Sequence, residues 1–293
     1  MRRLSQCDAT VLIEGETGTG KELVARALHY LGNRRTAPFI AVNCGAIPDS
    51  LVESEFFGHA SGAFTDAKQA RAGVVAQAQG GTLFLDEVDS LSARSQVSLL
   101  RFLQDYEYRP VGGSASKSAN VRVVAASNAD LEQLVTAGSY RRDLLYRLNV
   151  LSVHLPPLRE RDDDVRLLAE AFLRRLSVRH GTPPRTLHPD TLVFLRTYAW
   201  PGNVRELENL IQREFLLSDD DQIRIRPAGA APGCDVDSRS MPTDDTFQQA
   251  KARAIAQFER AYIGELLERT RGNLSLAARL CGKERSRLGK LLK

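Results

Sequence analysis

The stretch Val11-Leu-Ile-Glu-Gly15-Glu-Thr-Gly-Thr-Gly-Lys21 decides the fold of this chain of 293 residues. A short apolar run leads into a glycine-rich loop, and the loop ends in a lysine where a helix-forming segment starts. Glycines let successive backbone N–H groups turn toward phosphates, the helix N-terminus adds positive potential, and Lys21 adds a point charge. The pattern therefore predicts a phosphate-binding loop that joins a strand to a helix. The residues expected around the nucleotide are Gly15, Glu16, Thr17, Gly18, Thr19, Gly20, Lys21 and Glu22.

A second, acidic motif lies downstream in Thr82-Leu-Phe-Leu-Asp86-Glu87. The motif has the pattern of an apolar strand that ends in two carboxylates. We expect Asp86 to hold a magnesium ion, directly or through water, and Glu87 to polarise the attacking water. A strand end that is acidic by chance is the alternative, and the phosphate loop upstream makes it the weaker one.

Two asparagines close other predicted strands. Asn43 follows the apolar run 39–42, and Asn128 follows the run 121–127. A polar side chain at such a strand end can orient water near the γ-phosphate, but asparagine is also a common turn former. Spacing alone leaves both interpretations open for both residues.

Short β-branched runs alternate with helix-like stretches through the first half of the chain. Buried strands are predicted at 11–13, 39–42, 82–86, 121–127 and 151–155, and helices at 22–31, 51–57 and 96–104. Strands that are nearly all apolar and alternate with helices indicate a parallel sheet covered on both faces. We therefore expect an α/β domain at 1–157.

From Leu158 onward the pattern becomes purely helical, with helices predicted at 163–177, 189–198 and 203–217. We expect residues 158–220 to form an α-helical lid. Residues 221–246 are rich in Pro, Gly, Asp and Ser without periodicity, so they are interpreted as a linker. A last helical domain is expected at 247–293.

Composition excludes several classes of protein. Hydrophobic residues make up 43% and charged residues 26% of the chain, which is typical of a folded globular protein. No apolar run approaches the roughly 20 residues that a membrane span needs, and the N-terminus lacks the pattern of a signal peptide. The four cysteines are scattered, so we expect neither a zinc site nor a disulfide framework, but reduced thiols in the cytoplasm.

The net charge of +4 hides an asymmetry, because residues 246–293 carry 11 Lys and Arg against 4 Asp and Glu, and the remainder carries 29 against 32. Three short helices are predicted at 261–270, 274–280 and 284–292, with Gly282 in the turn before the last. This helix-turn-helix spacing on a basic segment is typical of DNA binding. A solvated basic helix or a small oligomerisation module is the alternative. The residues expected to face the DNA groove are Lys283, Arg285, Ser286, Arg287 and Lys290.

The segment Ser139-Tyr-Arg141-Arg142-Asp-Leu-Leu-Tyr-Arg147 holds three arginines. Arginines that reach across a subunit boundary can neutralise charge developing on a γ-phosphate, an effect worth about 10³–10⁵ in rate in other NTPases. A solvated helix face explains the same run, and composition does not decide between the two.

The hexapeptide Gly62-Ala63-Phe64-Thr65-Asp66-Ala67 places an aromatic side chain among small residues. Such surroundings argue against a packed segment, so Phe64 is interpreted as a partner contact on a flexible loop. The alternative is that Phe64 packs into the core beneath an ordinary loop.

These motifs occur in the order and spacing of a known family. With the segments VNCGAIPDSLVESEFFGH (42–59), LPPLRERDDDV (155–165) and WPGNVRELEN (200–209), the chain resembles the AAA+ ATPase module of sigma-54-dependent activators, the bacterial enhancer-binding proteins. Its C-terminal end resembles the Fis-type domain of the same family, so the resemblance covers nearly the whole chain. It implies an α/β AAA+ P-loop ATPase with a parallel sheet between helices, an α-helical lid and a C-terminal all-α helix-turn-helix domain.

The resemblance also implies roles for residues that spacing left open. Asn43 would hold the catalytic Glu87 in check until the substrate contact is made. Arg141 and Arg147 match the finger arginines, which leaves Arg142 as a surface residue. Arg205, at the start of a lid helix, would reach the bound phosphates from the other side.

The hexapeptide resembles the loop with which this family grips sigma-54, and whose usual sequence is GAFTGA. Phe64 and Thr65 match the contact residues, whereas Asp66 stands where the family has its second glycine. Asp66 adds a negative charge and removes backbone freedom at the tip of the loop. Glu22 stands where other phosphate loops have Ser or Thr, and in this it agrees with the family.

The function implied is an ATPase that uses ATP and Mg²⁺, assembles as a homo-oligomeric ring, expected to be a hexamer, binds enhancer DNA and remodels sigma-54 RNA polymerase. The alternative is a DNA-binding regulator of the same ancestry that does not engage sigma-54 and in which ATP sets the oligomeric state. A protein-unfolding AAA+ chaperone is disfavoured, because it has no use for a helix-turn-helix. Since no N-terminal receiver or ligand-sensing domain is apparent, we expect either a minimal activator controlled by a separate regulatory protein or a fragment.

Overall fold

The computed structural model describes residues 2–63, 69–218, 220–225 and 270. The chain divides into two compact units, Met1–Ala228 and Gly229–Lys293. Apart from Thr270, the second unit lies outside the described residues, and with it the expected DNA-binding residues Lys283, Arg285, Ser286, Arg287 and Lys290. Within the described ranges, no helix combines the length and the apolar character that crossing a membrane requires.

A five-stranded parallel sheet with the strand order β2-β5-β8-β1-β9 forms the base of the first unit. β1 pairs with β8 on one side and β9 on the other, so the phosphate loop leaves the carboxyl end of an inner strand. The strands are β1 (Val11–Glu14), β2 (Phe39–Asn43), β5 (Thr82–Asp86), β8 (Arg122–Ser127) and β9 (Leu151–His154). The predicted parallel sheet is confirmed, with strand bounds within one residue of the apolar runs.

The inner strands are buried on both faces because their side chains alternate between two cores. In β5, Leu83 and Leu85 belong to the larger core, and Phe84 between them belongs to the smaller core on the opposite face. β8 alternates in the same way, with Val123 in the larger core and Val124 in the smaller one.

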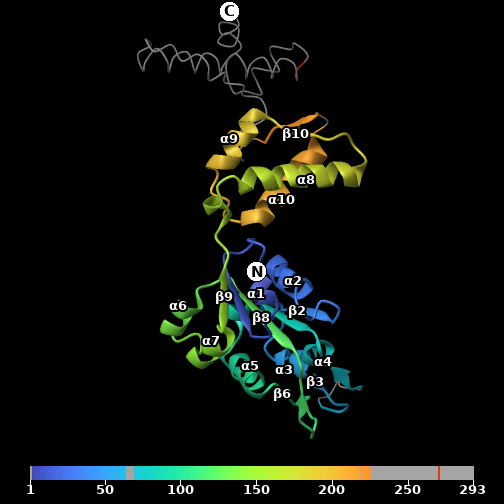
Figure 1. The fold of residues 1–293 in the computed structure, drawn as a ribbon, viewed down its shortest axis with the longest axis vertical. Coiled ribbons are helices and arrows are strands. Elements are labelled where there is room, and N and C mark those ends of the chain that lie inside the picture. The colour runs from blue at the N-terminus through green and yellow to red at the C-terminus, as the bar shows by residue number, and fades with distance from the viewer. Residues whose placement is uncertain (1, 64–68, 219, 226–269, 271–293) are drawn as a thin grey trace, which may run out of the picture. The chain divides into compact units, whose positions relative to one another are not determined.

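Helices cover both faces of the sheet. α2 supplies Ala25 and Leu28 to the smaller core, whereas α3, α5, α6 and α7 supply the larger one. Figure 1 shows α6 and α7 beside β9, on the far side of the sheet from β2. The elements are α1 (Arg2–Ser5), α2 (Lys21–Tyr30), α3 (Val52–Phe57), α4 (Val74–Gln77), α5 (Ala93–Asp105), α6 (Leu131–Thr136) and α7 (Arg142–Leu148), with the 3-10 helices η1 (Cys44–Ala46), η2 (Val88–Ser90) and η3 (Leu158–Glu160).

The two edge strands depart from the sequence prediction. Their apolar runs predict full burial, but β2 and β9 are only partly buried. The cause is topological, because each edge strand has a paired neighbour on one side and none within this sheet on the other.

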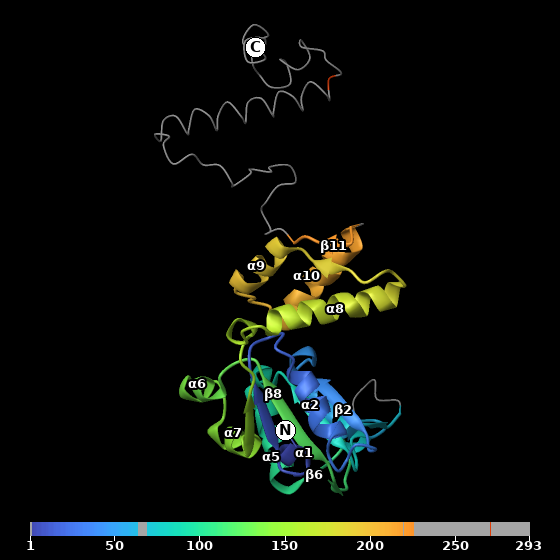
Figure 2. The same cartoon turned by 45° about the horizontal axis from the view of Figure 1, so that its top comes forward.

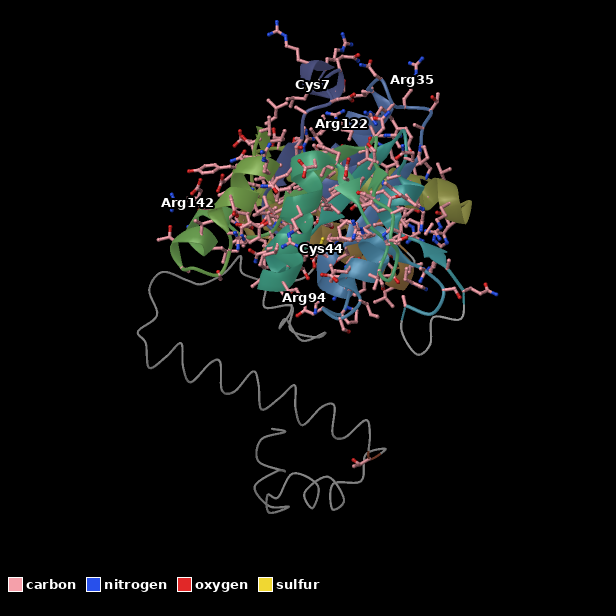
Figure 3. The ribbon with its side chains drawn as sticks, turned by 90° about the horizontal axis from the view of Figure 1, so that it is seen from below. Cys7, Arg35, Cys44, Arg94, Arg122 and Arg142 are labelled. Carbon is pink, nitrogen blue, oxygen red and sulfur yellow. The ribbon has the colours of Figure 1, made fainter. Side chains whose placement is uncertain are left out.

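Arg122, at the start of β8, fastens the N-terminal helix to the sheet. Its buried guanidinium donates to the carbonyl oxygens of Leu4 at 2.6 Å and Ser5 at 3.1 Å, which are among the last carbonyls of α1. Figure 3 shows Arg122 directly beneath this segment. Burial lowers the pKa of Arg122 from its usual value, and the carbonyl partners offset the loss of hydration.

The lid consists of three helices packed around the fully buried Trp200. Trp200 Nε1 donates to the Leu195 carbonyl at 2.9 Å, so the polar atom of this large side chain is satisfied in the core. The helices are α8 (Asp164–His180), α9 (Pro189–Thr197) and α10 (Asn203–Leu217), as Figure 2 shows. Their positions agree closely with the predicted helical segments.

The lid differs from a purely helical one in a single parallel pair of short strands. β10 (Thr186–Leu187) pairs with β11 (Gln222–Ile223), and Ile223 and Ile225 are buried in the lid core. The prediction of a linker from residue 221 therefore does not hold for 222–225. These few residues show no helical period, and their apolar side chains find a place only through tertiary packing.

Two short hairpins project from the larger-core side of the sheet. β3 (Gly58–His59) pairs with β4 (Arg71–Ala72), and β6 (Glu107–Tyr108) pairs with β7 (Lys117–Ser118). The hairpins are joined, because Val111 N donates to Gly58 O at 2.8 Å and Ala60 N donates to Val111 O at 2.9 Å. The first hairpin carries the hexapeptide, of which Phe64, Thr65, Asp66 and Ala67 lie outside the described residues.

Buried and exposed side chains alternate along α7. Substitutions on this one helix therefore test how much burial in the larger core contributes to stability. Leu144 is fully buried, so Leu144→Ala leaves a cavity and should lower the free energy of unfolding by about 2–5 kcal/mol. Tyr146 is 65% exposed, so Tyr146→Ala should change it by less than about 0.5 kcal/mol. Urea denaturation followed by circular dichroism measures both, and equal losses would contradict the burial pattern.

Candidate nucleotide site

The phosphate loop lies between β1 and α2, where glycines permit backbone that other residues avoid. Gly18 and Gly20 have φ angles of 81° and 99°, in the left-handed region, and Gly20 precedes the first residue of α2. A Cβ on Gly18 would lie 2.3 Å from the carbonyl oxygen of Gly202 in the lid. Glycine at position 18 therefore lets the lid backbone approach the loop.

Lys21 joins the loop to the sheet. Its Nζ donates to the carbonyl oxygens of Gly15 at 2.6 Å and Glu16 at 3.0 Å, and to Asn128 Oδ1 at 2.6 Å. Burial lowers the pKa of Lys21, and the nearby negative charge of Asp86 opposes that effect. The contact with Asn128 brings together two residues that are far apart in the sequence and were both predicted at the site.

Two carboxylates stand at the end of β5, as predicted. Burial raises the pKa of Asp86, while a hydrogen bond from the backbone N–H of Glu87, at 3.0 Å, favours its ionised form. Glu87 has a φ of 55°, an unusual conformation for a non-glycine residue and one that clusters at functional sites. Mg²⁺ commonly takes one or two carboxylates together with substrate phosphates, so this pair fits the ion that the sequence predicts.

Asn43 lies beside these carboxylates, because β2 and β5 pair with Asn43 opposite Asp86. A Cβ built on Gly45 would lie 2.7 Å from Glu87 Oε2 and 3.4 Å from Asn43 Oδ1, so a glycine leaves the space that both groups share. Asn43 Oδ1 accepts from the N–H of Ala46 at 3.1 Å, which is the turn-forming contact that sequence reasoning left open.

Asp89 is a site residue that sequence reasoning missed. Its Oδ1 accepts from the backbone N–H of Asn128 and from the hydroxyl of Ser127, both at 3.0 Å. Asp89 thereby fixes the end of β8, from which Asn128 reaches Lys21. The one signal in the sequence was a third carboxylate three residues after Asp86, and that spacing is common on surfaces.

A cavity of about 280 Å³ opens between the loop, the strand ends and the start of α10. Arg205 lines it from the lid, with Glu208 one helical turn further along. The lining residues are Thr17, Gly18, Gly20, Lys21, Glu22, Leu23, Arg26, Asp86, Glu87, Asn128, Val204, Arg205 and Glu208. Of the predicted nucleotide-site residues, Gly15, Glu16 and Thr19 do not line this cavity, and neither does Asn43.

The candidate finger arginines lie away from this cavity. Arg141 precedes α7 and forms an ion pair with Asp143 at 2.7 Å, and Arg147 is exposed near the end of the same helix. Arg142 lies at the outer edge of the fold (Figure 3). The backbone N–H of Arg141 donates to Gln96 Oε1 at 2.9 Å, so the start of α7 is anchored to α5. Within one chain, the structure does not bring these arginines to the phosphates.

Of the hexapeptide in the predicted contact loop, the structure describes the first two residues, Gly62 and Ala63. Gly62 is exposed and has a φ of 80°, and no atom of the described residues lies within 4 Å of a Cβ built on it, as in an exposed turn. Ala63 packs closely against Gly112 of the second hairpin, since a Cβ on Gly112 would lie 2.8 Å from the Cβ of Ala63.

Comparison with protein families gives matches to all three parts of the chain. Residues 1–154 match the sigma-54 interaction domain, residues 159–227 the AAA+ ATPase lid domain, and residues 254–293 the bacterial regulatory proteins of the Fis family. With the parallel sheet and the lid, these matches confirm the expected fold class.

Curated proteins include several similar chains. The transcriptional regulatory protein GlrR of Escherichia coli strain K12 is 43% identical over 291 residues, which cover 99% of this chain and 64% of GlrR. The response regulator protein PilR of Pseudomonas aeruginosa is 45% identical over 283 residues, covering 96% of this chain and 63% of PilR. The chain thus spans less than two thirds of the length of these relatives.

Among solved structures, NtrX from Brucella abortus in complex with ATP is similar, with a TM-score of 0.71 and 32% sequence identity. The similarity covers 99% of this chain and 64% of that chain. A structure of NtrX in complex with ADP gives a TM-score of 0.72 with the same coverage.

Asp89 offers a test of the site's architecture. Asp89→Ala leaves the Asn128 N–H and the Ser127 hydroxyl without this charged acceptor, so we expect the free energy of unfolding to fall by about 1.5–3 kcal/mol. Asp105→Ala, at an exposed carboxylate at the end of α5, is the control and should stay within about 0.5 kcal/mol. Urea denaturation measures both, and an unchanged Asp89→Ala variant would argue against the anchoring role.

Proposed function

This chain belongs to the family of sigma-54-dependent transcriptional regulators, and we propose that it is an ATP-driven activator that remodels sigma-54 RNA polymerase from enhancer DNA. The observation that carries the proposal is one cavity that gathers Lys21, the carboxylates of Asp86 and Glu87, Asn128 and Arg205. These residues come from the phosphate loop, two strand ends and the lid. Their convergence supports a nucleotide site with a role for each group.

The roles follow from charge and position. Lys21 and the loop N–H groups would bind the β- and γ-phosphates, and Asp86 would hold Mg²⁺, which would supply positive charge against the charge that develops on the transferred phosphoryl group. Glu87 polarises the attacking water, and Asn128 orients it from the end of β8. The ATP in the NtrX complex supports the choice of nucleotide.

The proposed site also requires a second copy of the chain, which would supply the finger arginines. Arg141 and Arg147 lie at the start and near the end of α7, the helix beside β9 in Figure 1, whereas the cavity is lined by the first residues of α2. Each side carries exposed apolar residues: Leu23, at the cavity rim, is 70% exposed, and Tyr146, beside Arg147, is 65% exposed. Two different faces that meet head to tail generate a ring when the rotation closes. In such a ring the arginines of one subunit complete the site of the next.

A short stretch of chain connects the candidate hydrolysis site to the contact loop. Asn43, which shares the space over Gly45 with Glu87, is followed directly by η1 and then by α3. α3 ends at Phe57, and the next residue begins β3 of the hexapeptide hairpin. We infer that a change in the Asn43–Glu87 pair on hydrolysis moves the loop that carries Phe64 and Thr65 against sigma-54.

Asp66 favours a second candidate function. An acidic residue at the tip, where the family has glycine, is compatible with a DNA-binding regulator that no longer engages sigma-54 and in which ATP controls assembly. In both functions the basic segment 247–293, of which residues 254–293 match the Fis family, binds DNA.

Subunit mixing tests action across the boundary. Lys21→Ala and Arg147→Ala should each abolish ATP hydrolysis, whereas Arg142→Ala, on the same helix as Arg147, should retain it. In a one-to-one mixture of the two inactive variants, about a quarter of the sites combine an intact lysine with an intact neighbouring arginine. Phosphate release should recover accordingly, and no recovery at any mixing ratio would count against action in trans.

Trapping sigma-54 with an ATP transition-state analogue separates the two functions. We expect the wild-type protein to form the complex, Phe64→Ala to lose it and Asp66→Gly to match or exceed the wild type, because Asp tolerates turn backbone and glycine adds freedom. Native gel electrophoresis with purified sigma-54 measures the complex. A wild type that hydrolyses ATP and binds DNA without trapping, beside an Asp66→Gly variant that does trap, would establish the second function.

A further inference from the structure

A dense polar network ties the phosphate loop to the lid, and Glu16 is at its centre. The Glu16 carboxylate accepts two hydrogen bonds from the guanidinium of Arg159, at 2.6 and 2.9 Å, and a third from Asn203 Nδ2 at 3.1 Å. Glu16 does not line the nucleotide cavity. The fork-to-fork geometry with Arg159 is the most directional form of an ion pair.

Asn203 is the second element of this network. It is fully buried, it is the first residue of α10, and its φ of 51° is in the left-handed region. Its Nδ2 also donates to the carbonyl oxygen of Thr17 at 3.0 Å, and its Oδ1 accepts from the N–H of Leu158 at 2.8 Å. An amide is needed here, because a single side chain both donates to the loop and accepts from the start of the lid.

Two more hydrogen bonds to carbonyl oxygens of the phosphate loop join it to the lid. Val204 N donates to Gly18 O at 3.0 Å, and Arg161 Nη2 donates to Thr19 O at 3.2 Å. The approach of Gly202 to Gly18 depends on the missing side chain at position 18. The N-terminal turn of α10 is therefore seated on the phosphate loop itself.

This turn also carries the residues that face the nucleotide. Asn203 is bound to Glu16, and Val204 and Arg205, which follow it directly, line the cavity. The direction of Arg205 thus depends on how the first turn of α10 is held. We propose that Glu16 is a positioning residue rather than a nucleotide ligand: through Arg159 and Asn203 it latches the lid helix to the phosphate loop and sets Arg205 toward the phosphates.

The Glu16 carboxylate of the latch is ionised at neutral pH. The hydrogen bonds from Arg159, and then from Asn203, lower the pKa of Glu16 from 4.5 to about 2. Because this pKa is depressed in the folded protein, its stabilising effect is complete above pH 4.5 and is lost as the pH falls toward 2. The Glu16 and Arg159 side chains are each 42% exposed, so screening by water and salt limits the energy of the pair. Its contribution is geometric.

Amide hydrogen exchange tests the latch without nucleotide. In Glu16→Ala, the N–H groups of Leu158 and Val204 should exchange about tenfold faster than in the wild type, because local opening of the junction becomes easier. Glu170→Ala is the matched control, since it breaks the exposed Arg166–Glu170 pair on α8, away from the phosphate loop. Unchanged exchange at both amides in Glu16→Ala would overturn the latch.

Steady-state kinetics test the effect of Glu16 on Arg205. This second experiment rests on the proposed ATPase function. We expect Glu16→Ala and Arg205→Ala each to raise the KM for ATP by about tenfold, and the double variant to be no worse than Arg205→Ala alone. Additive effects of the two substitutions, or a KM unchanged in Glu16→Ala, would overturn the positioning role. A wild type without ATP hydrolysis would refute the proposed function alone, because hydrogen exchange reports on the latch in either case.

Discussion

A buried lysine ammonium connects the phosphate loop to the sheet, and the geometry of the nucleotide site depends on it. An ammonium has three donors, and Lys21 directs them to two carbonyl oxygens of its own loop and to Asn128. All three donors of Lys21 have partners in the structure, so a phosphate oxygen that accepts a hydrogen bond from Lys21 must replace one of them. Asn128 is the one of the three that accepts through its side chain. Under the proposed function, a phosphate that replaced Asn128 would free its amide at the edge of the sheet where the attacking water would lie. This one contact thus joins the phosphate loop to the end of β8.

The features that the sequence predicted well are those in which chemistry and backbone come from one continuous stretch. The phosphate loop follows its own strand and opens its own helix, so the order strand, glycines, lysine implies the geometry around Lys21. Asp86 and Glu87 were placed in the same way, because they end a run that has to be a buried strand. In a parallel sheet the carboxyl ends of strands share one edge, and this brings Asn128 to the same place.

The missed features depend on partners that are far apart in the chain. Asp89 and Asn203 are ordinary polar residues in sequence, and they become structural because Ser127 or Glu16 meets them in the fold. Glu16 was predicted to contact the nucleotide because it lies within the phosphate loop, whose other residues were expected to surround the phosphates. In the structure its carboxylate contacts Arg159, 143 positions away. Partial burial of the two edge strands was missed for a related reason, since an apolar run does not reveal how many neighbours a strand will have.

The joined hairpins have a second connection to the nucleotide site. Glu87 is followed by η2 and then by α5, which leads to β6, while Asn43 leads through η1 and α3 to β3. Phe57 at the end of α3 packs on Phe102 of α5 and Tyr108 of β6, with ring centroids 6.0 and 6.2 Å apart. Two helices of unequal length therefore join the same pair of strand ends to the same pair of hairpins. A movement of Asn43 relative to Glu87 would therefore act on both hairpins at once, through a helix of 6 residues on one side and a helix of 13 residues on the other.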